Sequence, residues 1–205
     1  MITLHHLNKS RSKRIIWLLE ELEQPYEIAA YQRDATTFLA PPELKAVHPL
    51  GKSPVLEIDG KVLAESGAIT EYLIHRYAPD TLAPAKDSPE YADYLYWMHF
   101  AESSAMLPLL LVTFLKREPA KTEFLESYAN SEAANILGYI NQCLEGKNYL
   151  VGDSLTGADI MMSFVTDVLA QQGVIENFPN IAVYHQTLSA RPAYQTAEKT
   201  EKAHN

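Results

Sequence analysis

The 205-residue sequence contains a single cysteine, Cys143, and only 17 basic residues against 26 acidic ones. One cysteine excludes an internal disulfide framework and is typical of a protein in a reducing cytoplasm. The formal net charge of −9 argues against a surface that follows the phosphates of a nucleic acid duplex, because such a surface needs a basic stripe. Composition therefore predicts an acidic globular chain without a nucleic acid partner.

Long apolar runs are also missing. The N-terminal segment MITLHHLNKS has no charged leader followed by an apolar run, so no signal peptide is expected. The most apolar stretch, 106–115, is about ten residues long and contains Pro108, which is too short to cross a bilayer. We therefore expect a soluble cytoplasmic protein without a membrane partner.

Several motifs of common enzyme classes are absent. The seven histidines are scattered, without HExxH or paired Cys/His spacing, so no metal site is predicted. There is no GxGxxG or Walker pattern for a nucleotide and no G-x-S-x-G elbow for a serine hydrolase. A Cys-x-x-Cys redox pair is missing too, and Cys143 lies in a helical stretch where burial is the expected role.

The first 78 residues alternate between strand-like and helical patterns. Apolar residues at i, i+3, i+4 and i+7 predict an amphipathic helix over 11–23, and Asp59-Gly60 between two apolar runs predicts a hairpin. The predicted order is β-α-β-α-β-β-α, with strands at 2–7, 26–31, 55–58 and 61–63, a short helix near Pro41-Pro42, and a helix over 66–77.

The second half is predicted to be entirely helical. Residues 80–87 are rich in Pro and Ala and form a linker, so we expect one domain over 1–79 and another over 88–205. Ser88 and Pro89 predict a helix start, Pro108 a kink in that helix, and further helices are expected over 120–145 and after Pro179.

A capping box is predicted at the start of another helix in this half. Thr156 is the expected N-cap, Asp159 reaches back to its backbone, and Leu155 with Ile160 forms the hydrophobic staple.

The hairpin is followed by Glu65 and Ser66 at a helix start. This end of a helix favours an anion, so Ser66 with the helix end can hold a carboxylate while Glu65 accepts from an amine, as an α-amino acid headgroup requires. The alternative is a plain N-cap beside a solvated acid. Pro54 stands at the start of the preceding strand, where a proline suits a bend or a cis peptide. A cis peptide would leave the Ser53 backbone open to an extended peptide. The alternative is an ordinary strand-edge proline.

Together these motifs resemble the soluble, cytosolic glutathione transferases, in particular serine-type bacterial and fungal members. The resemblance rests on Gly51-Lys52-Ser53-Pro54-Val55, the hairpin, Glu65-Ser66, the element order and the 155–160 segment. It implies a thioredoxin-like first domain, a helical second domain and a homodimer. It further implies that Pro54 is cis, that Ser53 pairs with the cysteinyl backbone of glutathione, and that Glu65 and Ser66 hold its γ-glutamyl end. Lys52 is placed to meet a carboxylate of the tripeptide or is a surface lysine.

The family places a Tyr, Ser or Cys beside the glutathione sulfur. Ser10 is the first candidate, because the segment SRSKR resembles the serine-type pattern with an arginine four residues on. Ser12, Asn8 and His6 are lower-ranked alternatives, and Ser10 as a helix N-cap is the competing interpretation. No proton-abstracting base is evident in the motif. Arg14 is either a cation near the sulfur or a packing or surface ion-pair residue.

The resemblance implies a detoxifying transferase that activates the thiol of glutathione as a thiolate for attack on a hydrophobic electrophile or a peroxide. Glutathione is then a co-substrate, with no tightly bound cofactor. A glutathione-dependent disulfide reductase and a non-catalytic binding or regulatory protein are the alternatives. Glu102 is a candidate contact to the partner subunit's glutathione. Four residues are candidates for an interdomain electrophile wall or for core: Trp97, Met98, Met106 and Phe114.

Overall fold

The computed structural model describes residues 1–204, which form two compact units. The first contains residues 1–83 together with 188–204, and the second contains residues 84–187. The sequence predicts a division at the 80–87 linker and assigns all later residues to the helical domain. The structure differs at the C-terminal end, because the last helix packs on a helix of the first unit.

A four-stranded sheet with the order β2-β1-β3-β4 forms the centre of the first unit. β1 pairs in parallel with β2 and antiparallel with β3, and β3 pairs antiparallel with β4. Asp59 and Gly60 both have positive φ, 51° and 77°, as a tight hairpin turn requires. The predicted strands and hairpin are confirmed, with these bounds: β1 Ile2–Leu7, β2 Glu27–Tyr31, β3 Val55–Ile58 and β4 Lys61–Ala64.

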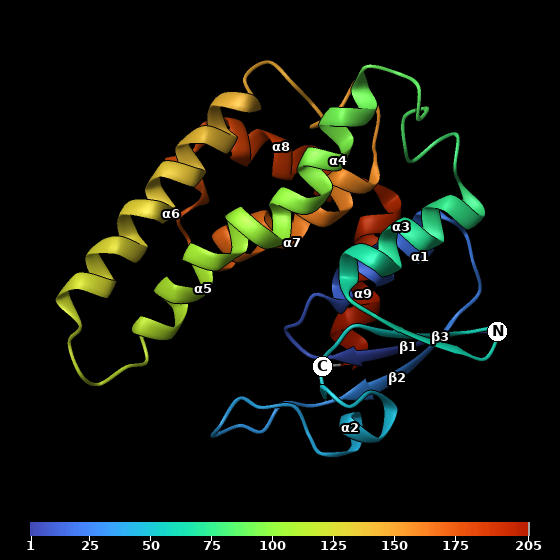
Figure 1. Cartoon of the computed structure of the whole chain (residues 1–205), viewed down its shortest axis with the longest axis horizontal. Coiled ribbons are helices and arrows are strands. Elements are labelled where there is room, and N and C mark those ends of the chain that lie inside the picture. The colour runs from blue at the N-terminus through green and yellow to red at the C-terminus, as the bar shows by residue number, and fades with distance from the viewer. Residues whose placement is uncertain (205) are drawn as a thin grey trace. The chain divides into compact units, whose positions relative to one another are not determined.

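Helices cover both faces of this sheet. In Figure 1, α1 and α3 lie on one side of the strands and α2 lies on the other. The predicted β-α-β-α-β-β-α order is confirmed, and this unit is thioredoxin-like. The helices of the unit are α1 Ser12–Glu21, α2 Glu43–Val47, α3 Ser66–Tyr77 and α9 Pro192–His204.

Helix α1 is buried on nearly all sides, although its sequence predicts an amphipathic helix. Ile15 and Leu19 are fully buried, and the polar residues Lys13 and Arg14 on its first turn are buried as well. The cause is α9, which packs against the face that the sequence leaves to solvent. There Lys13 Nζ donates to Glu198 Oε1 at 2.8 Å.

This Lys13–Glu198 pair gives α9 docking a pH dependence. Burial raises the pKa of the Glu198 carboxyl, but the hydrogen bonds and charges of Lys13 and Lys202 outweigh it, so the pKa lies below its ordinary value. A depressed folded pKa stabilises the protein above the ordinary value of about 4.3, and this contribution disappears as pH falls through the folded pKa. Because Glu198 is partly exposed, we expect about 0.5 to 1 kcal/mol.

Urea unfolding of wild type and Glu198→Gln measures this effect. The variant should be less stable at pH 7 and equal to wild type once the pH is below the folded pKa. Glu145→Gln, at an exposed position of the second unit, is the control and should show no such difference at either pH. An equal loss for Glu198→Gln at both pH values would contradict the prediction.

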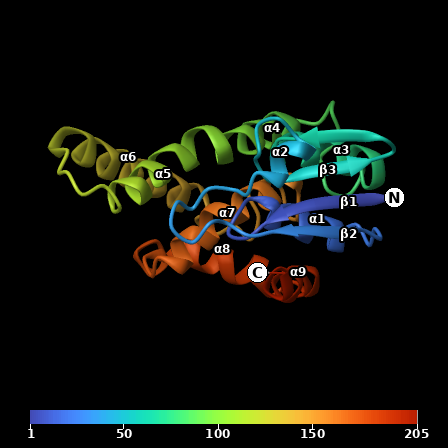
Figure 2. The ribbon, with the colours of Figure 1, turned by 90° about the horizontal axis from the view of Figure 1, so that it is seen from below.

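The second unit is all-helical within the described residues. Its elements are α4 Glu90–Phe100, η1 Ala101–Ala105, α5 Met106–Leu115, α6 Glu123–Cys143, α7 Gly157–Gln171, η2 Ile175–Asn177 and α8 Pro179–Ser189, whose last two residues belong to the first unit. Figures 1 and 2 show α5 and α6 side by side, and α4 packs on α7.

Three details differ from the sequence prediction. A π-helical turn, η1, interrupts the long helix just before Pro108, which lacks an N–H and crowds the carbonyl four residues earlier. Helix α4 begins at Glu90, with Pro89 at the N-cap position. Two helices follow Pro179, because Pro192 disfavours helical geometry at Arg191 and starts α9 afresh.

The capping box at the start of α7 is confirmed. Thr156 Oγ1 accepts from the Ala158 N–H at 3.3 Å, and Asp159 Oδ2 accepts from the Thr156 N–H at 2.8 Å. Asp159 Oδ1 also accepts from the Leu150 N–H at 2.9 Å and from the Tyr184 hydroxyl at 2.8 Å. One buried carboxylate therefore ties together a helix start, the preceding loop and α8.

The helical run Glu90–Leu115 spans 26 residues and is apolar enough to cross a membrane by length and composition. The apolar stretch 106–115 forms only the last ten residues of this run, because η1 joins it to α4. Core helices of soluble proteins meet the same criterion, and here α4 and α5 pack on α7 and α6.

Candidate functional site

Three hydroxyls and a histidine meet at the C-terminal end of β1. Ser10 Oγ lies 2.7 Å from Ser12 Oγ and 3.3 Å from Ser53 Oγ. Ser12 Oγ lies 2.7 Å from His6 Nδ1. His6, Ser10 and Ser12 are all buried, with at most 4% of each residue exposed. The site thus offers a short, enclosed row of polar groups from His6 through Ser12 to Ser10, and Ser10 is the least buried of these three.

Ser10 is not the N-cap of α1, since the N-cap position belongs to Arg11 and has no side-chain cap. Ser10 instead stands one residue earlier, where its Oγ accepts from the Ser12 N–H at 3.2 Å. The preceding turn is made possible by Lys9, whose φ is 53°. This geometry lets the Ser10 oxygen satisfy a helix N–H while its proton stays within the hydroxyl cluster.

Asn8 is occupied elsewhere. Its Oδ1 accepts from the Arg33 N–H at 2.9 Å, and its carbonyl oxygen accepts from Arg33 Nε at 3.1 Å. These bonds hold the loop after β1 against the segment after β2, and no hydrogen bond among residues 1–204 joins the Asn8 side chain to the serines. The structure therefore favours a structural role for Asn8.

The side chain of Ser53 is hydrogen-bonded within the protein, whereas its backbone is open. The Ser53–Pro54 peptide bond is cis, as expected. Ser53 Oγ donates to the His5 carbonyl at 2.8 Å and accepts from the Leu7 N–H at 3.1 Å, so the side chain is tied to β1. Among the described residues, nothing hydrogen-bonds to the Ser53 backbone N–H or C=O. A peptide-like donor and acceptor are thus left open at the start of β3.

Glu65 and Ser66 lie at the N-terminus of α3, with their roles shifted by one residue from the prediction. Glu65 holds the N-cap position and has a φ of 71°, which is costly for a residue other than glycine. Ser66 is the first helical residue and is 4% exposed, whereas Glu65 is exposed. Ser66 Oγ accepts from Arg14 Nη1 at 3.2 Å.

Arg14 is a packed residue, which is one of the roles expected from the sequence, and not a surface ion pair. Arg14 is 1% exposed, and its guanidinium Nη1 donates to Ser66 Oγ at the start of α3. Because the guanidinium donates to Ser66 Oγ, the Ser66 proton is free to donate outward. A buried cation and an oriented hydroxyl therefore stand behind the first turn of α3, which suits a carboxylate.

Lys52 is exposed, beside the buried Gly51 in the loop before β3. Gly51 has a φ of +57°, and a Cβ there would lie 2.7 Å from Lys45 Cγ, so the loop needs a glycine at this point. In residues 1–204 Lys52 has no ion pair, which leaves it available to a ligand or to solvent.

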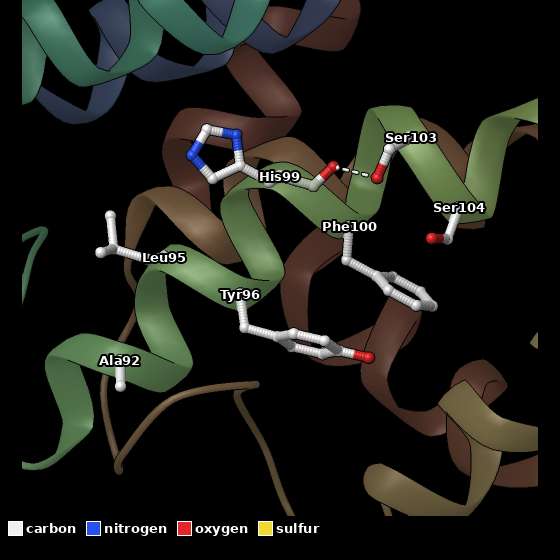
Figure 3. Close-up of a pocket in the computed structure, with 7 residues that line it drawn as sticks. All are labelled: Ala92, Leu95, Tyr96, His99, Phe100, Ser103 and Ser104. Atoms are coloured by element: carbon white, nitrogen blue, oxygen red, sulfur yellow. Dashed lines mark hydrogen bonds between the residues drawn. The ribbon is translucent and has the colours of Figure 1, made fainter.

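Glu102 lies in η1 of the second unit and is partly exposed. A groove of about 360 Å³ runs along α4 and η1, and in Figure 3 Tyr96, Phe100 and Ser103 project from this one helical run. None of the residues expected to bind glutathione lines the groove, which is formed by Ala92, Leu95, Tyr96, His99, Phe100, Ser103 and Ser104.

The four candidates for the electrophile wall separate into two groups. Trp97, Met98 and Met106 are at most 6% exposed and belong to the core of the helical unit, whereas Phe114 is 61% exposed. No group of three or more His, Cys, Asp and Glu side chains in residues 1–204 is arranged to hold a metal ion.

Sequence reasoning missed the link between His6 and Ser12. The alternation in β1 contains the signal: Ile2, Leu4 and His6 share one face of the strand, and helical residue Ser12 follows a four-residue turn. It also missed that His5, on the opposite face, bonds to Tyr31 and Glu57 at 3.0 Å each.

Comparisons with known proteins identify the family of this chain. Residues 1–75 match the family model "Glutathione S-transferase, N-terminal domain", and residues 106–196 match "Glutathione S-transferase, C-terminal domain". Glutathione S-transferase 3 of Schizosaccharomyces pombe is 36% identical, over 98% of this chain and 88% of its own length. Glutathione S-transferase 1 of Saccharomyces cerevisiae is 32% identical, over 99% and 96%.

Solved structures give the same result. A glutathione S-transferase from Actinobacillus pleuropneumoniae is 37% identical with a TM-score of 0.89, covering 98% of this chain and 93% of its own. A sphingomonad glutathione S-transferase, solved in complex with glutathione, has a TM-score of 0.81 at 24% identity, covering 98% of each chain. With both family domains matched in order along a chain that has this thioredoxin-like sheet and helical second unit, the protein belongs to the glutathione S-transferase family.

Proposed function

We propose that this protein binds glutathione in its first unit and stabilises the thiolate for attack on an electrophilic small molecule. The observation that carries the proposal is the open backbone of Ser53. Its N–H and C=O lack protein partners while its side chain is fixed to β1, which suits pairing with an extended peptide as an added strand. Membership in the family supports glutathione as that peptide.

The ends of the tripeptide have matching groups. The γ-glutamyl carboxylate meets Ser66 and the first turn of α3, with Arg14 behind them, and its amine meets the exposed Glu65. Lys52 is available to the other carboxylate. The sphingomonad relative, whose structure contains glutathione, supports this class of ligand for the fold.

Ser10 is the proposed partner of the sulfur. A free thiol with a pKa of about 8.5 is about 3% ionised at pH 7, and lowering that pKa by about 2 units takes about 2.7 kcal/mol of differential stabilisation. A donated hydroxyl and the nearby start of α1 supply favourable interactions with a thiolate. The thiolate then attacks an electrophilic carbon to form a thioether, and the leaving group departs.

The family further supports a homodimer, in which Glu102 reaches the partner's glutathione, and a hydrophobic second substrate. It also supports a cytoplasmic location. Reduction of a peroxide or of a disulfide would begin from the same thiolate.

Titrating the bound thiol tests the proposal. Thiolate absorbance is followed across pH for glutathione with wild type, Ser10→Ala and Ser154→Ala, the last an exposed serine of the second unit. In wild type and Ser154→Ala the bound thiol should ionise well below its free pKa. Ser10→Ala should return that pKa toward the free value by about 1 unit, which lowers kcat/KM about tenfold at a pH below both pKa values.

The other outcomes are equally informative. If glutathione binds and Ser10→Ala ionises it like wild type, Ser10 is not the sulfur partner. Binding with an unshifted thiol in wild type would assign the chain to a carrier or regulatory role, and no binding would overturn the proposal.

A further inference from the structure

His6 stands at the end of a chain of hydrogen bonds that begins at Ser10. His6 Nδ1 lies 2.7 Å from Ser12 Oγ, which lies 2.7 Å from Ser10 Oγ. Both distances are short enough for well-formed hydrogen bonds, and the chain is enclosed, since His6 and Ser12 are fully buried. The proposed function gives a role to Ser10 alone, so the two groups behind it need an explanation.

The protons available to this row of hydrogen bonds show that it can transfer a proton. Each serine has one proton to donate, so the state of His6 sets the direction of the chain. When Nδ1 is unprotonated, Ser12 donates to it, and Ser10 donates to Ser12 Oγ at 2.7 Å in preference to Ser53 Oγ at 3.3 Å, which leaves the Ser10 oxygen to accept a proton. When Nδ1 is protonated, it donates to Ser12, Ser12 donates to Ser10, and the Ser10 proton points outward. The same distances therefore fit both ends of a proton transfer.

We infer that His6 is the terminal acceptor of a proton relay that ionises bound glutathione through Ser10 and Ser12. This inference rests on the proposed function. In the step, the S–H bond breaks and its proton passes to Ser10 Oγ, the Ser10 proton passes to Ser12 Oγ, and the Ser12 proton passes to His6 Nδ1. The products are a thiolate and an imidazolium, no bond between heavy atoms changes, and Ser10 ends as a donor to the thiolate.

The charges around His6 make the proton transfer depend on bound glutathione. Two cations, Lys13 and Arg14, follow Ser12 on α1, and Lys13 is paired with Glu198, so it is mainly Arg14 that disfavours a further positive charge nearby in the free protein. The thiolate supplies the compensating negative charge. The other titratable groups on the elements packed against β1 are Glu20 and Glu21 of α1, Glu27 and Tyr31 of β2, and Glu57 of β3.

Proton release separates this relay from simple stabilisation by Ser10. Glutathione is mixed with the full-length protein in weakly buffered solution, and thiolate absorbance and a pH-indicator dye are read together. A proton retained on His6 does not reach the solvent, so wild type should release far fewer than one proton for each thiolate formed. Ser12→Ala interrupts the chain, so less thiolate should form and each should release about one proton.

Three further variants sharpen the comparison. His6→Asn should behave like Ser12→Ala, and Ser12→Thr, which restores a hydroxyl, should recover the retained proton. His5→Gln is the matched control, because the His5 side chain is also buried but points to the other face of β1 and bonds to Tyr31 and Glu57. It should release protons as wild type does.

Turnover provides a second readout. With chlorodinitrobenzene as the electrophile and at a pH below the bound pKa, kcat/KM should fall by up to about tenfold in Ser12→Ala, no more than in Ser10→Ala, while the glutathione Kd changes less than about twofold. One proton released per thiolate in wild type, with Ser12→Ala unchanged, would overturn the relay and leave the proposed function intact. Glutathione bound without thiolate in wild type would overturn both.

Discussion

Replacing Asp159 by alanine is expected to lower the free energy of unfolding by about 3 to 5 kcal/mol, the largest stability effect that we predict for a single side chain. The carboxylate accepts four hydrogen bonds, from the backbone of Leu150, the backbone and side chain of Thr156, and the hydroxyl of Tyr184. Alanine leaves these donors buried without an acceptor. For a chain of this length the melting temperature should fall by about 10 °C.

Further variants distinguish the loss of the whole Asp159 hydrogen-bond network from the loss of the helix cap alone. Tyr184→Phe removes one donor and should cost about 1 kcal/mol, because no unsatisfied group remains. Asp159→Asn keeps the shape but replaces an acceptor by an amide donor, so its cost should fall between those of Tyr184→Phe and Asp159→Ala. Glu123→Ala changes an exposed acid in the first turn of α6 and should stay within about 0.5 kcal/mol of wild type.

Urea unfolding measures all four variants. A loss below about 1 kcal/mol for Asp159→Ala would mean that water or nearby groups satisfy the donors left without the carboxylate, and the buried network would then not hold the loop, α7 and α8 together. Unchanged glutathione binding in Asp159→Ala at low temperature would show that the first unit keeps its fold when the second is destabilised.

Local sequence signals predicted most elements, because their causes are local. The Asp59-Gly60 turn defines its hairpin through backbone conformation alone, and Thr156 and Asp159 close a capping box within four residues. Elements that depend on distant residues were harder to predict. Helix α1 has an amphipathic sequence yet is buried, since α9, some 180 residues later, covers it.

The candidate site also combines features that the local sequence predicts with features that depend on distant residues. Ser53-Pro54 and Glu65-Ser66 are readable as motifs, and the cis peptide follows the prediction. The partners behind them are not readable, because they depend on which face of a strand or helix meets which neighbour. His6 reaches Ser12 through the pleat of β1, and Arg14 reaches Ser66 across the packing of α1 on α3.

Removing the Arg14 cation is expected to weaken glutathione binding by about 10- to 100-fold. Arg14→Met keeps most of the buried volume but removes the charge and the donor to Ser66 Oγ. A charge-assisted hydrogen bond contributes about 1.5 to 3 kcal/mol, and 1.4 kcal/mol is a factor of ten in Kd. Ser66→Ala should lose a similar amount, and the double variant should lose little more than either, because the two residues act through one bond.

Lys13→Met is the matched control, since Lys13 is the neighbouring buried cation of α1 but bonds to Tyr194 and Glu198 of α9. It should lower stability while the glutathione Kd stays within about twofold. Calorimetric titration gives Kd for each variant, and thermal unfolding shows whether it is folded at the titration temperature.

Truncated peptides identify which carboxylate Arg14 serves. γ-Glutamylcysteine keeps the γ-glutamyl headgroup and cysteinylglycine lacks it, so wild type should prefer the former. Because Arg14 stands behind Ser66 at the start of α3, Arg14→Met should lose affinity for γ-glutamylcysteine and keep its weak affinity for cysteinylglycine. An equal loss for both peptides would place the effect of Arg14 in the packing of α1 on α3 and not in recognition of the headgroup.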